Sequence, residues 1–128
     1  MKKRIILDTN FLMIPPQYKI DIFQEIKKIM NEPYEMCVFK ETITELKKIA
    51  SGKGKDSSNA KVALLLIKQK NLKSLKNSHN LGYVDDIILN NITDEDIVCT
   101  QDKALKKRLK EKYPNIQIIT LNKKLIMR

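Results

Sequence analysis

The 128-residue sequence contains two cysteines, one histidine and no tryptophan, and it lacks any apolar run long enough to span a membrane. The basic start, Met1 to Arg4, is followed by only three apolar residues before Asp8, which is too short for a signal peptide. We therefore expect a cytoplasmic protein without a membrane partner. Cys37 and Cys99 each lie inside an apolar run, which predicts reduced core thiols rather than a disulfide.

A phosphate-binding P-loop is also missing. Residues 51–56 form a basic, glycine-containing loop, but they lack the G-x-x-x-x-G-K-[ST] spacing and follow a helical pattern rather than a strand. The single histidine, His79, lies in a polar loop over residues 77–82, and we assign it no role.

Charge is uneven along the chain, which has a formal net charge of +10. Residues 45–80 hold nine Lys and Arg against two acids, and residues 101–128 again hold nine against two. Between them, residues 81–100 hold five acids and no basic residue. A basic body with a local acidic cluster is typical of a polyanion binder whose cleft holds cations, and a lysine-rich solubilising surface is the alternative.

Apolar spacing predicts one domain over residues 1–128, in which short strands alternate with helices. Pro15-Pro16 predicts a turn or an extended piece within residues 11–18. The alternation favours a single-domain three-layer α/β/α sandwich with a mostly parallel sheet of four to five strands. The predicted strands are residues 5–7, 36–39, 72–75, 97–100 and 116–121. The predicted helices are residues 21–30, 42–50, 60–67 (apolar almost all round, hence buried), one that opens at residue 84, and one that follows residue 102.

Acidic residues recur where this fold places ligands. Asp8 directly follows the first strand and Asp102 follows a later one, so a parallel sheet brings both to the edge where ligands bind in open α/β folds. Asp85 lies at a helix start, where an N-cap is the alternative. On a helical wheel Glu45 falls toward the edge of an apolar face, whereas Glu41 falls nearly opposite and is expected to face water.

Four carboxylates gathered at one edge repel one another and raise each other's pKa values. A hard divalent cation removes this penalty, because carboxylate oxygens and water are its preferred ligands. Mg²⁺ or Mn²⁺ in such a site suits phosphodiester hydrolysis, in which the metal activates a water and stabilises the leaving oxygen. Haloacid dehalogenase-like phosphatases fit less well, because Asn10 stands where they need a second Asp, and receiver domains need an acidic pair where only Asp8 is present.

The acids lie in four segments that resemble, in order, the acidic motifs of PIN-domain nucleases: Ile6-Leu7-Asp8-Thr9-Asn10, Thr44-Glu45-Leu46, Val84-Asp85-Asp86-Ile87-Ile88 and Thr100-Gln101-Asp102-Lys103-Ala104-Leu105. The resemblance covers the whole chain. Pro15-Pro16 before Asp21 and the Asp85-Asp86 pair are similar to the archaeal branch related to the endonucleases that mature small-subunit ribosomal RNA. Gln101 stands where this branch often has Asn, and the Cys-rich tail of zinc-ribbon relatives is absent.

The resemblance implies a metal-dependent endoribonuclease of ribosomal RNA processing, with Mg²⁺ or Mn²⁺ as cofactor. Its implied partners are single-stranded RNA or precursor ribosomal RNA, with a homodimer and ribosome-assembly factors as further candidates. Asp8, Asp85 and Asp102 would be metal ligands, and Glu45 a ligand or a group that positions water. The residues that would support these ligands are Asn10, Thr100 and Asp86. A catalytically weak RNA-binding PIN module and a toxin-type PIN ribonuclease are the alternatives.

Three lysines, Lys53, Lys55 and Lys103, lie within a few residues of an acidic-motif helix and are predicted to hold the RNA backbone. Because aromatic residues make up 5% of the chain, extensive base stacking is not expected. Binding should then be mainly electrostatic and steeply dependent on salt. The alternative is that these lysines form only a solvated face.

Overall fold

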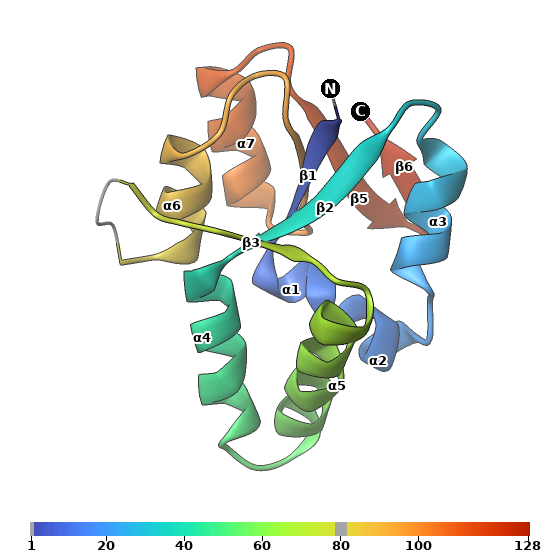
Figure 1. Ribbon diagram of the computed structural model, residues 1–128, viewed down its shortest axis with the longest axis vertical. Coiled ribbons are helices and arrows are strands. Elements are labelled where there is room, and N and C mark those ends of the chain that lie inside the picture. Colours follow the sequence, from blue (N-terminus) through green and yellow to red (C-terminus); the bar gives the residue numbers. More distant parts are fainter. Residues whose placement is uncertain (1, 79–81) are drawn as a thin grey trace.

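A mostly parallel β-sheet runs through the middle of the protein in the computed structural model, which describes residues 2–78 and 82–128 (Figure 1). Within these residues the sheet has six strands in the order β3-β2-β1-β4-β5-β6, and only the β5–β6 pair is antiparallel. The prediction for His79 falls outside the described residues. The strands are β1 (Lys3–Leu7), β2 (Tyr34–Phe39), β3 (Lys73–Leu75), β4 (Ile97–Cys99), β5 (Gln117–Asn122) and β6 (Lys124–Met127).

Helices cover both faces of this sheet, so the three-layer α/β/α prediction is confirmed. The first five helices bury their apolar residues on one face, and the last two bury theirs on the other. In the described part of the chain the helices are α1 (Thr9–Leu12), α2 (Ile14–Tyr18), α3 (Ile22–Ile29), α4 (Lys40–Ala50), α5 (Lys55–Gln69), α6 (Val84–Asn90) and α7 (Lys103–Lys112).

Strand β1 explains why the sequence shows a continuous apolar run rather than an alternating one. Ile5 and Leu7 belong to the core cluster under α1–α5, whereas Ile6 belongs to the cluster under α6 and α7. All three side chains are fully buried. Burial of such a side chain stabilises the fold by about 1.5–3 kcal/mol. The central strand is therefore fixed from both faces, and its end is a rigid position for Asp8.

The sheet has one strand more than the sequence predicted. Strand β6 forms an antiparallel hairpin with β5, in which Asn122 pairs with Lys124. Lys123 between them adopts a positive φ of 65°. A left-handed turn of this kind is more typical of Gly, Asn or Asp than of lysine, so no residue type at this position signals the hairpin.

The prediction of a turn or extended piece over residues 11–18 is wrong, because this segment is helical. The chain forms α1, breaks at Met13, and continues as α2 with Pro15 and Pro16 in its first turn. Proline is tolerated there because the first-turn N–H groups have no partner inside the helix. The two prolines therefore exclude one continuous helix, as expected, but not a second short one.

Helix α5 is longer and more exposed than predicted. It begins at Lys55, five residues before the predicted start, after Gly54 at a φ of 91°. Its inner face is buried, but Val62 and Leu65 are 39% and 58% exposed, so the prediction of a helix buried all round is wrong. Although α5 is the longest helix described, neither it nor any other helix in the described residues has the length and apolarity to span a membrane.

The two cysteines are free and buried, as the sequence predicted. Burial raises the pKa of the Cys37 thiol to about 11 and that of Cys99 further above its ordinary value. Both thiols are therefore neutral near pH 7, and their packing rather than their reactivity explains their position.

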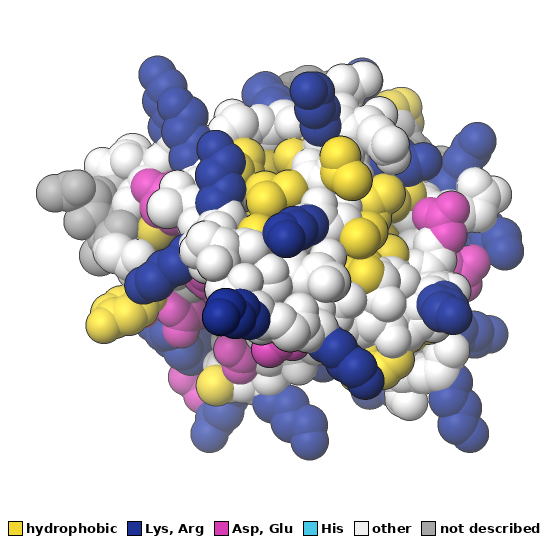
Figure 2. Space-filling view, turned by 90° about the horizontal axis from the view of Figure 1, so that it is seen from below, with side chains coloured by type: hydrophobic (Ala, Val, Ile, Leu, Met, Phe, Trp, Pro, Cys, Tyr) yellow, Lys and Arg dark blue, Asp and Glu magenta, His cyan; other side chains and the backbone are white. Residues whose placement is uncertain are grey.

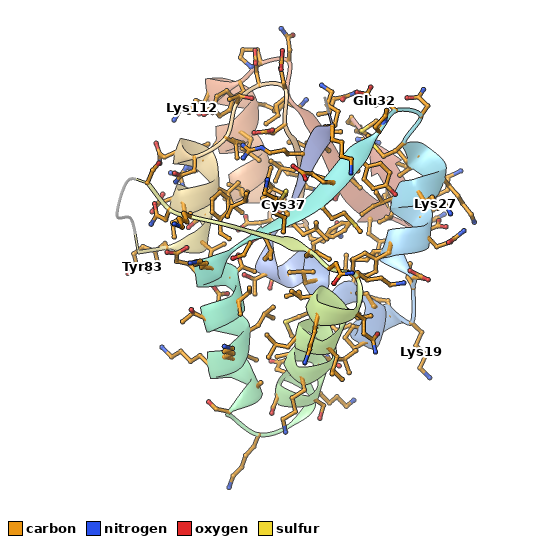
Figure 3. The ribbon with its side chains drawn as sticks, viewed as in Figure 1. Lys19, Lys27, Glu32, Cys37, Tyr83 and Lys112 are labelled. Atoms are coloured by element: carbon orange, nitrogen blue, oxygen red, sulfur yellow. The ribbon has the colours of Figure 1, made fainter. Side chains whose placement is uncertain are left out.

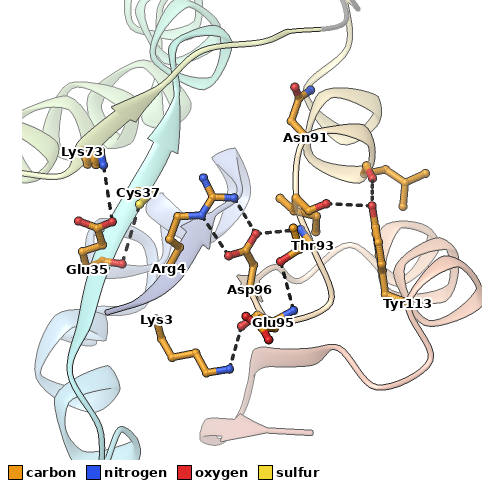
Figure 4. Close-up of polar contacts among 12 residues, drawn as sticks. Lys3, Arg4, Glu35, Cys37, Lys73, Asn91, Thr93, Glu95, Asp96 and Tyr113 are labelled. Carbon is orange, nitrogen blue, oxygen red and sulfur yellow. Dashed lines mark hydrogen bonds and ion pairs between the residues drawn. The ribbon is translucent and has the colours of Figure 1, made fainter. Parts of the chain in front are cut away.

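Polar contacts join β1 and β4 near the residues where these strands begin, at the end of the sheet away from Asp8 (Figure 4). The Arg4 guanidinium donates to both carboxylate oxygens of Asp96, at 3.0 and 2.7 Å, and Asp96 also accepts from the Thr93 N–H. The Tyr113 hydroxyl contacts the Leu89 and Ile92 carbonyls in the same region. Asp96 is buried, so these bonds satisfy a charge that would otherwise be costly in the core.

Candidate active site

The order of the strands creates a crevice beyond the ends of β1 and β4. From β1 the chain builds β2 and β3 on one side, and it then crosses to place β4 and β5 on the other side of β1. In open α/β sheets, ligands bind at this switch between two directions of strand order. Asp8 directly follows β1, and Asp102 lies three residues after β4. The fold therefore brings these two acids to the crevice.

A pocket of about 270 Å³ occupies this position. Four acids from four parts of the chain line it, and no Lys or Arg is among its described lining residues. The lining residues are Asp8, Thr9, Asn10, Glu45, Tyr83, Val84, Asp85 and Asp102. The structure thus brings together all four acids that the sequence singled out.

Asp8 is the most buried of these acids, at 7% exposure. One carboxylate oxygen accepts the Thr9 N–H at 2.8 Å, and the other accepts the Thr100 hydroxyl at 2.8 Å. Burial raises the pKa of Asp8, and these two bonds oppose the rise, while the negative charges of Asp102 and Asp85 add to it. The protein therefore holds a carboxylate here against an unfavourable environment, which a bound cation would relieve.

Thr100 connects the first and fourth acids. It is fully buried, and its hydroxyl donates to Asp8 and accepts the backbone N–H of Asp102 at 3.1 Å. Asp102 is the N-cap of α7 and accepts the Leu105 N–H at 3.1 Å. One hydroxyl group therefore links the Asp8 carboxylate to the backbone of Asp102, whose own carboxylate caps α7.

Asp85 and Asp86 share a basic partner, Arg108, which the sequence did not single out. Arg108 on α7 contacts Asp85 Oδ2 at 3.3 Å and Asp86 Oδ1 at 2.7 Å. Asp85 Oδ1 also accepts the Asp86 N–H at 3.0 Å. Asp86 is not among the described lining residues of the pocket, and it is linked to Asp85 through its own N–H and through the shared partner Arg108. No spacing rule links residues 85 and 108, so only the packing of α6 on α7 reveals this contact.

Glu45 lies on α4 and is more exposed than Asp8. Partial burial raises its pKa, and the charge of Asp8 raises it further, which places the two carboxylates within electrostatic range. The prediction that Glu41 faces water is wrong, because Glu41 is half-buried and its Oε1 atom is buried without a hydrogen bond among the described residues. A helical wheel considers one helix alone and cannot include the neighbouring elements that cover Glu41.

Of the remaining predicted residues, one lines the acidic pocket and the lysines lie outside its described lining. Asn10 is exposed and lines the pocket. Lys55 instead lines a separate groove beside α2, and Lys53 lies exposed in the loop before it. Lys103 is exposed at the start of α7, directly after Asp102. Figure 2 shows that lysine and arginine side chains extend over much of the face seen from below, around smaller acidic clusters.

One further residue of the pocket was not predicted. Tyr83 is the N-cap of α6 and is 77% exposed, and Figure 3 shows its side chain pointing away from the body of the protein. An exposed aromatic ring beside four carboxylates is not required for packing. The only sequence signal for it is its position directly before the Val84-Asp85-Asp86 motif.

The donor set of the pocket suits a hard divalent cation, although the side chains are not yet gathered around one point. Among the described residues, no three Asp, Glu, His or Cys side chains are close enough together to hold an ion as they stand. The Asp8 oxygens contact Thr9 and Thr100, and Asp85 contacts Arg108. A carboxylate oxygen with one such bond keeps a second lone pair for a metal, so the residues fit Mg²⁺ or Mn²⁺ chemically.

Comparison with known proteins assigns the chain to a family. Residues 5–124 match the family described as PIN like domain. The chain belongs to this family. It is 35% identical over 126 residues to a protein named ribonuclease VapC4 from Methanocaldococcus jannaschii, covering 94% of this chain and 92% of that protein. It is also 29% identical to the rRNA-processing protein fcf1 of Schizosaccharomyces pombe, covering 91% of this chain but only 58% of that longer protein.

Solved structures support the same PIN assignment. The PIN domain endonuclease Utp24 matches with a TM-score of 0.82 and 28% identity, covering 98% of this chain and 90% of that one. The VapBC2 complex from Rickettsia felis, solved with a promoter DNA fragment, matches with a TM-score of 0.65 at 15% identity, which shows the shared fold alone. The resemblance to PIN-domain nucleases and their rRNA-processing branch is therefore confirmed, and the role of each site residue stays a prediction.

Proposed function

We propose that this PIN protein is a divalent-metal-dependent endoribonuclease that cleaves single-stranded segments of precursor ribosomal RNA. The observation that carries the proposal is the pocket at the end of β1 and β4, which Asp8, Glu45, Asp85 and Asp102 line with no basic residue among the described lining residues. The relatives named as a ribonuclease and as rRNA-processing proteins support the choice of RNA.

In this proposal three of the acids hold the metal ion and the fourth orients the attacking water. Asp8, Asp85 and Asp102 hold Mg²⁺ or Mn²⁺, and Thr100 keeps Asp8 and Asp102 in place through its two hydrogen bonds. When bound, such an ion lowers the pKa of a water and stabilises the leaving oxygen of the phosphodiester. Glu45 is exposed enough to accept a hydrogen bond from that water and to orient it. Attack of the water oxygen on phosphorus would break the bond from phosphorus to the 3′ oxygen, which takes up a proton, so a 5′-phosphate and a 3′-hydroxyl remain.

The test is a cleavage assay on precursor ribosomal RNA and on an unstructured RNA, with Mn²⁺ or with excess EDTA. Wild type should cleave only with the metal. Asp8→Asn should not cleave, because it removes a charged ligand while keeping the shape of the side chain. Asp94→Asn is the matched control, since Asp94 is exposed in the loop before β4 and does not line the acidic pocket, and it should cleave normally. Cleavage by wild type in excess EDTA would exclude the proposed mechanism.

A toxin-type ribonuclease is the second candidate, because the match to the protein named ribonuclease VapC4 spans 92% of that protein, whereas fcf1 is matched over 58%. The two candidates share the same acids and differ in substrate. Expression of wild type, but not of Asp8→Asn, would arrest growth if the chain were a toxin. Specific cleavage of precursor ribosomal RNA without growth arrest would favour the processing role.

A further inference from the structure

Two grooves follow the acidic pocket, each joined to the one before it by shared lining residues. The first groove, of about 510 Å³, shares Asn10 with the acidic pocket and extends to Lys123. The second, of about 830 Å³, shares Gln17 and Tyr18 with the first and extends to Lys55. The shared residues make the three depressions neighbours in a row. A chain molecule that leaves the acidic pocket past Asn10 therefore meets Tyr18 next.

Tyr18 lies at the centre of this row and is 62% exposed. It is the last residue of α2, whose backbone is held by Pro15 and Pro16 and by the bond from the Lys19 N–H to the Pro15 carbonyl at 2.8 Å. In Figure 3 Lys19, the next residue, extends into solvent on the side opposite Tyr83. A rigid helix end thus presents an aromatic ring that the core does not use.

The charge changes sign along the row. The acidic pocket has four carboxylates, whereas the two grooves add Lys123 and Lys55 to their lining, with Asp56 as the only acid among the lining residues described. Polar uncharged side chains such as Gln17 and Asn122 make up much of the remainder. Lysines beyond an acidic pocket can bind the phosphates that neighbour the phosphate held at the proposed metal site. An aromatic ring between these lysines can stack on a base.

We propose that Tyr18 is a stacking platform for one unpaired base of an RNA strand that runs from the acidic pocket across Asn10 into these grooves. The proposal rests on RNA being the substrate, as the proposed function states. It adds to the expectation of mainly electrostatic binding, because one well-placed ring contributes without any contact to phosphate. Duplex RNA is disfavoured at this position, since its bases are stacked and paired and cannot reach the ring.

The test measures fluorescence anisotropy of a short labelled, unstructured RNA, in EDTA so that it stays intact. Tyr18→Ala should bind it on the order of 5- to 150-fold more weakly, the range for loss of one base–aromatic stack. Tyr18→Phe keeps the ring and should bind like wild type. Leu65→Ala is the matched control, because Leu65 is similarly exposed but lies on α5 outside the grooves. The salt dependence of Tyr18→Ala should equal that of wild type, since no charge is lost.

An abasic strand of equal length separates stacking from other causes. It keeps the phosphates but has no bases, so wild type and Tyr18→Ala should bind it equally. Equal RNA binding by wild type and Tyr18→Ala, a matching loss on the abasic strand, or failure of Tyr18→Phe to restore binding would each overturn the proposal. If wild type does not cleave RNA with Mn²⁺ but these binding results hold, the proposed function fails and the Tyr18 site stands. Cleavage with Mn²⁺ but without a Tyr18 effect would support the proposed function and overturn the Tyr18 site.

Discussion

The hydroxyl of Thr100 offers a sharp test of how the site is held together. Thr100→Val keeps the shape of the side chain but removes the group that donates to Asp8 and accepts from the Asp102 N–H. A hydrogen bond to a charged group contributes about 1.5–3 kcal/mol, and a neutral one about 0.5–1.5 kcal/mol. Because both partners stay buried or partly buried, we expect Thr100→Val to lower the free energy of unfolding by about 2–4 kcal/mol.

The measurement is thermal unfolding followed by circular dichroism, without metal. With an unfolding entropy of about 2.1 cal/mol/K per residue, this loss lowers the melting temperature of the 128-residue chain by roughly 7–15 °C. The bond lowers the pKa of Asp8, so it stabilises the ionised carboxylate more than the neutral one. The difference between Thr100→Val and wild type should therefore shrink as the pH falls and Asp8 becomes protonated.

Thr42→Val is the matched control. Thr42 on α4 is also fully buried, but its hydroxyl has no hydrogen bond among the described residues. The same substitution there removes an unsatisfied polar atom and should raise the melting temperature, by roughly 4 °C for about 1 kcal/mol. Equal melting-temperature shifts in Thr42→Val and Thr100→Val would refute the hydrogen-bond argument and would mean that both shifts come from packing.

Three further perturbations test other parts of the site. Burial raises the pKa of Asp8 above its value in the unfolded chain, so its contribution to stability is present at low pH and is lost as the pH rises. Asp8→Asn should therefore have a higher melting temperature than wild type near pH 7 in EDTA. Mn²⁺ should raise the melting temperature of wild type but not that of Asp8→Asn. Arg108→Gln frees Asp85 Oδ2 and removes a positive charge, so Mn²⁺ should bind more tightly in calorimetry; weaker binding would mean that Arg108 mainly orients the acid. Replacing Lys53 and Lys55 with Ala should reduce the slope of log affinity against log salt by about 1.4, if each lysine contacts one phosphate of single-stranded RNA.

Much of the site was visible in the sequence because it depends on where buried strands stop. An apolar run that ends at Asp8 fixes the position of that residue in a parallel sheet whatever the details of the helices. The same holds for Thr100 and Asp102 after β4. Asp21 was likewise placed correctly near the start of a helix, where it caps α3 by accepting the Phe23 and Gln24 N–H groups at 3.1 Å. These features are local, so the sequence around each residue was sufficient.

The features that were missed depend on contacts between distant segments. Arg108 belongs to a helix face that looks uniformly basic, and only the packing of α7 against α6 shows that it is paired with Asp85. Val62 and Leu65 look like core residues by composition, yet α5 turns them outward. Tyr18 was not singled out from the sequence, because only the packing of α2 shows that its ring is exposed and lines a groove.

If Asp8 holds a metal ion as proposed, its buried carboxylate links stability to metal binding. The Thr9 N–H and the Thr100 hydroxyl compensate only part of the penalty for burying this charge, because the pKa remains raised. In the proposed metal site, a cation that neutralises the carboxylate would remove the part that they leave uncompensated. A substitution that reduces the penalty in the metal-free protein, such as Asp8→Asn, therefore also removes part of the driving force for binding the ion. Stability without metal and affinity for metal should oppose each other at this residue, because both depend on the same buried charge.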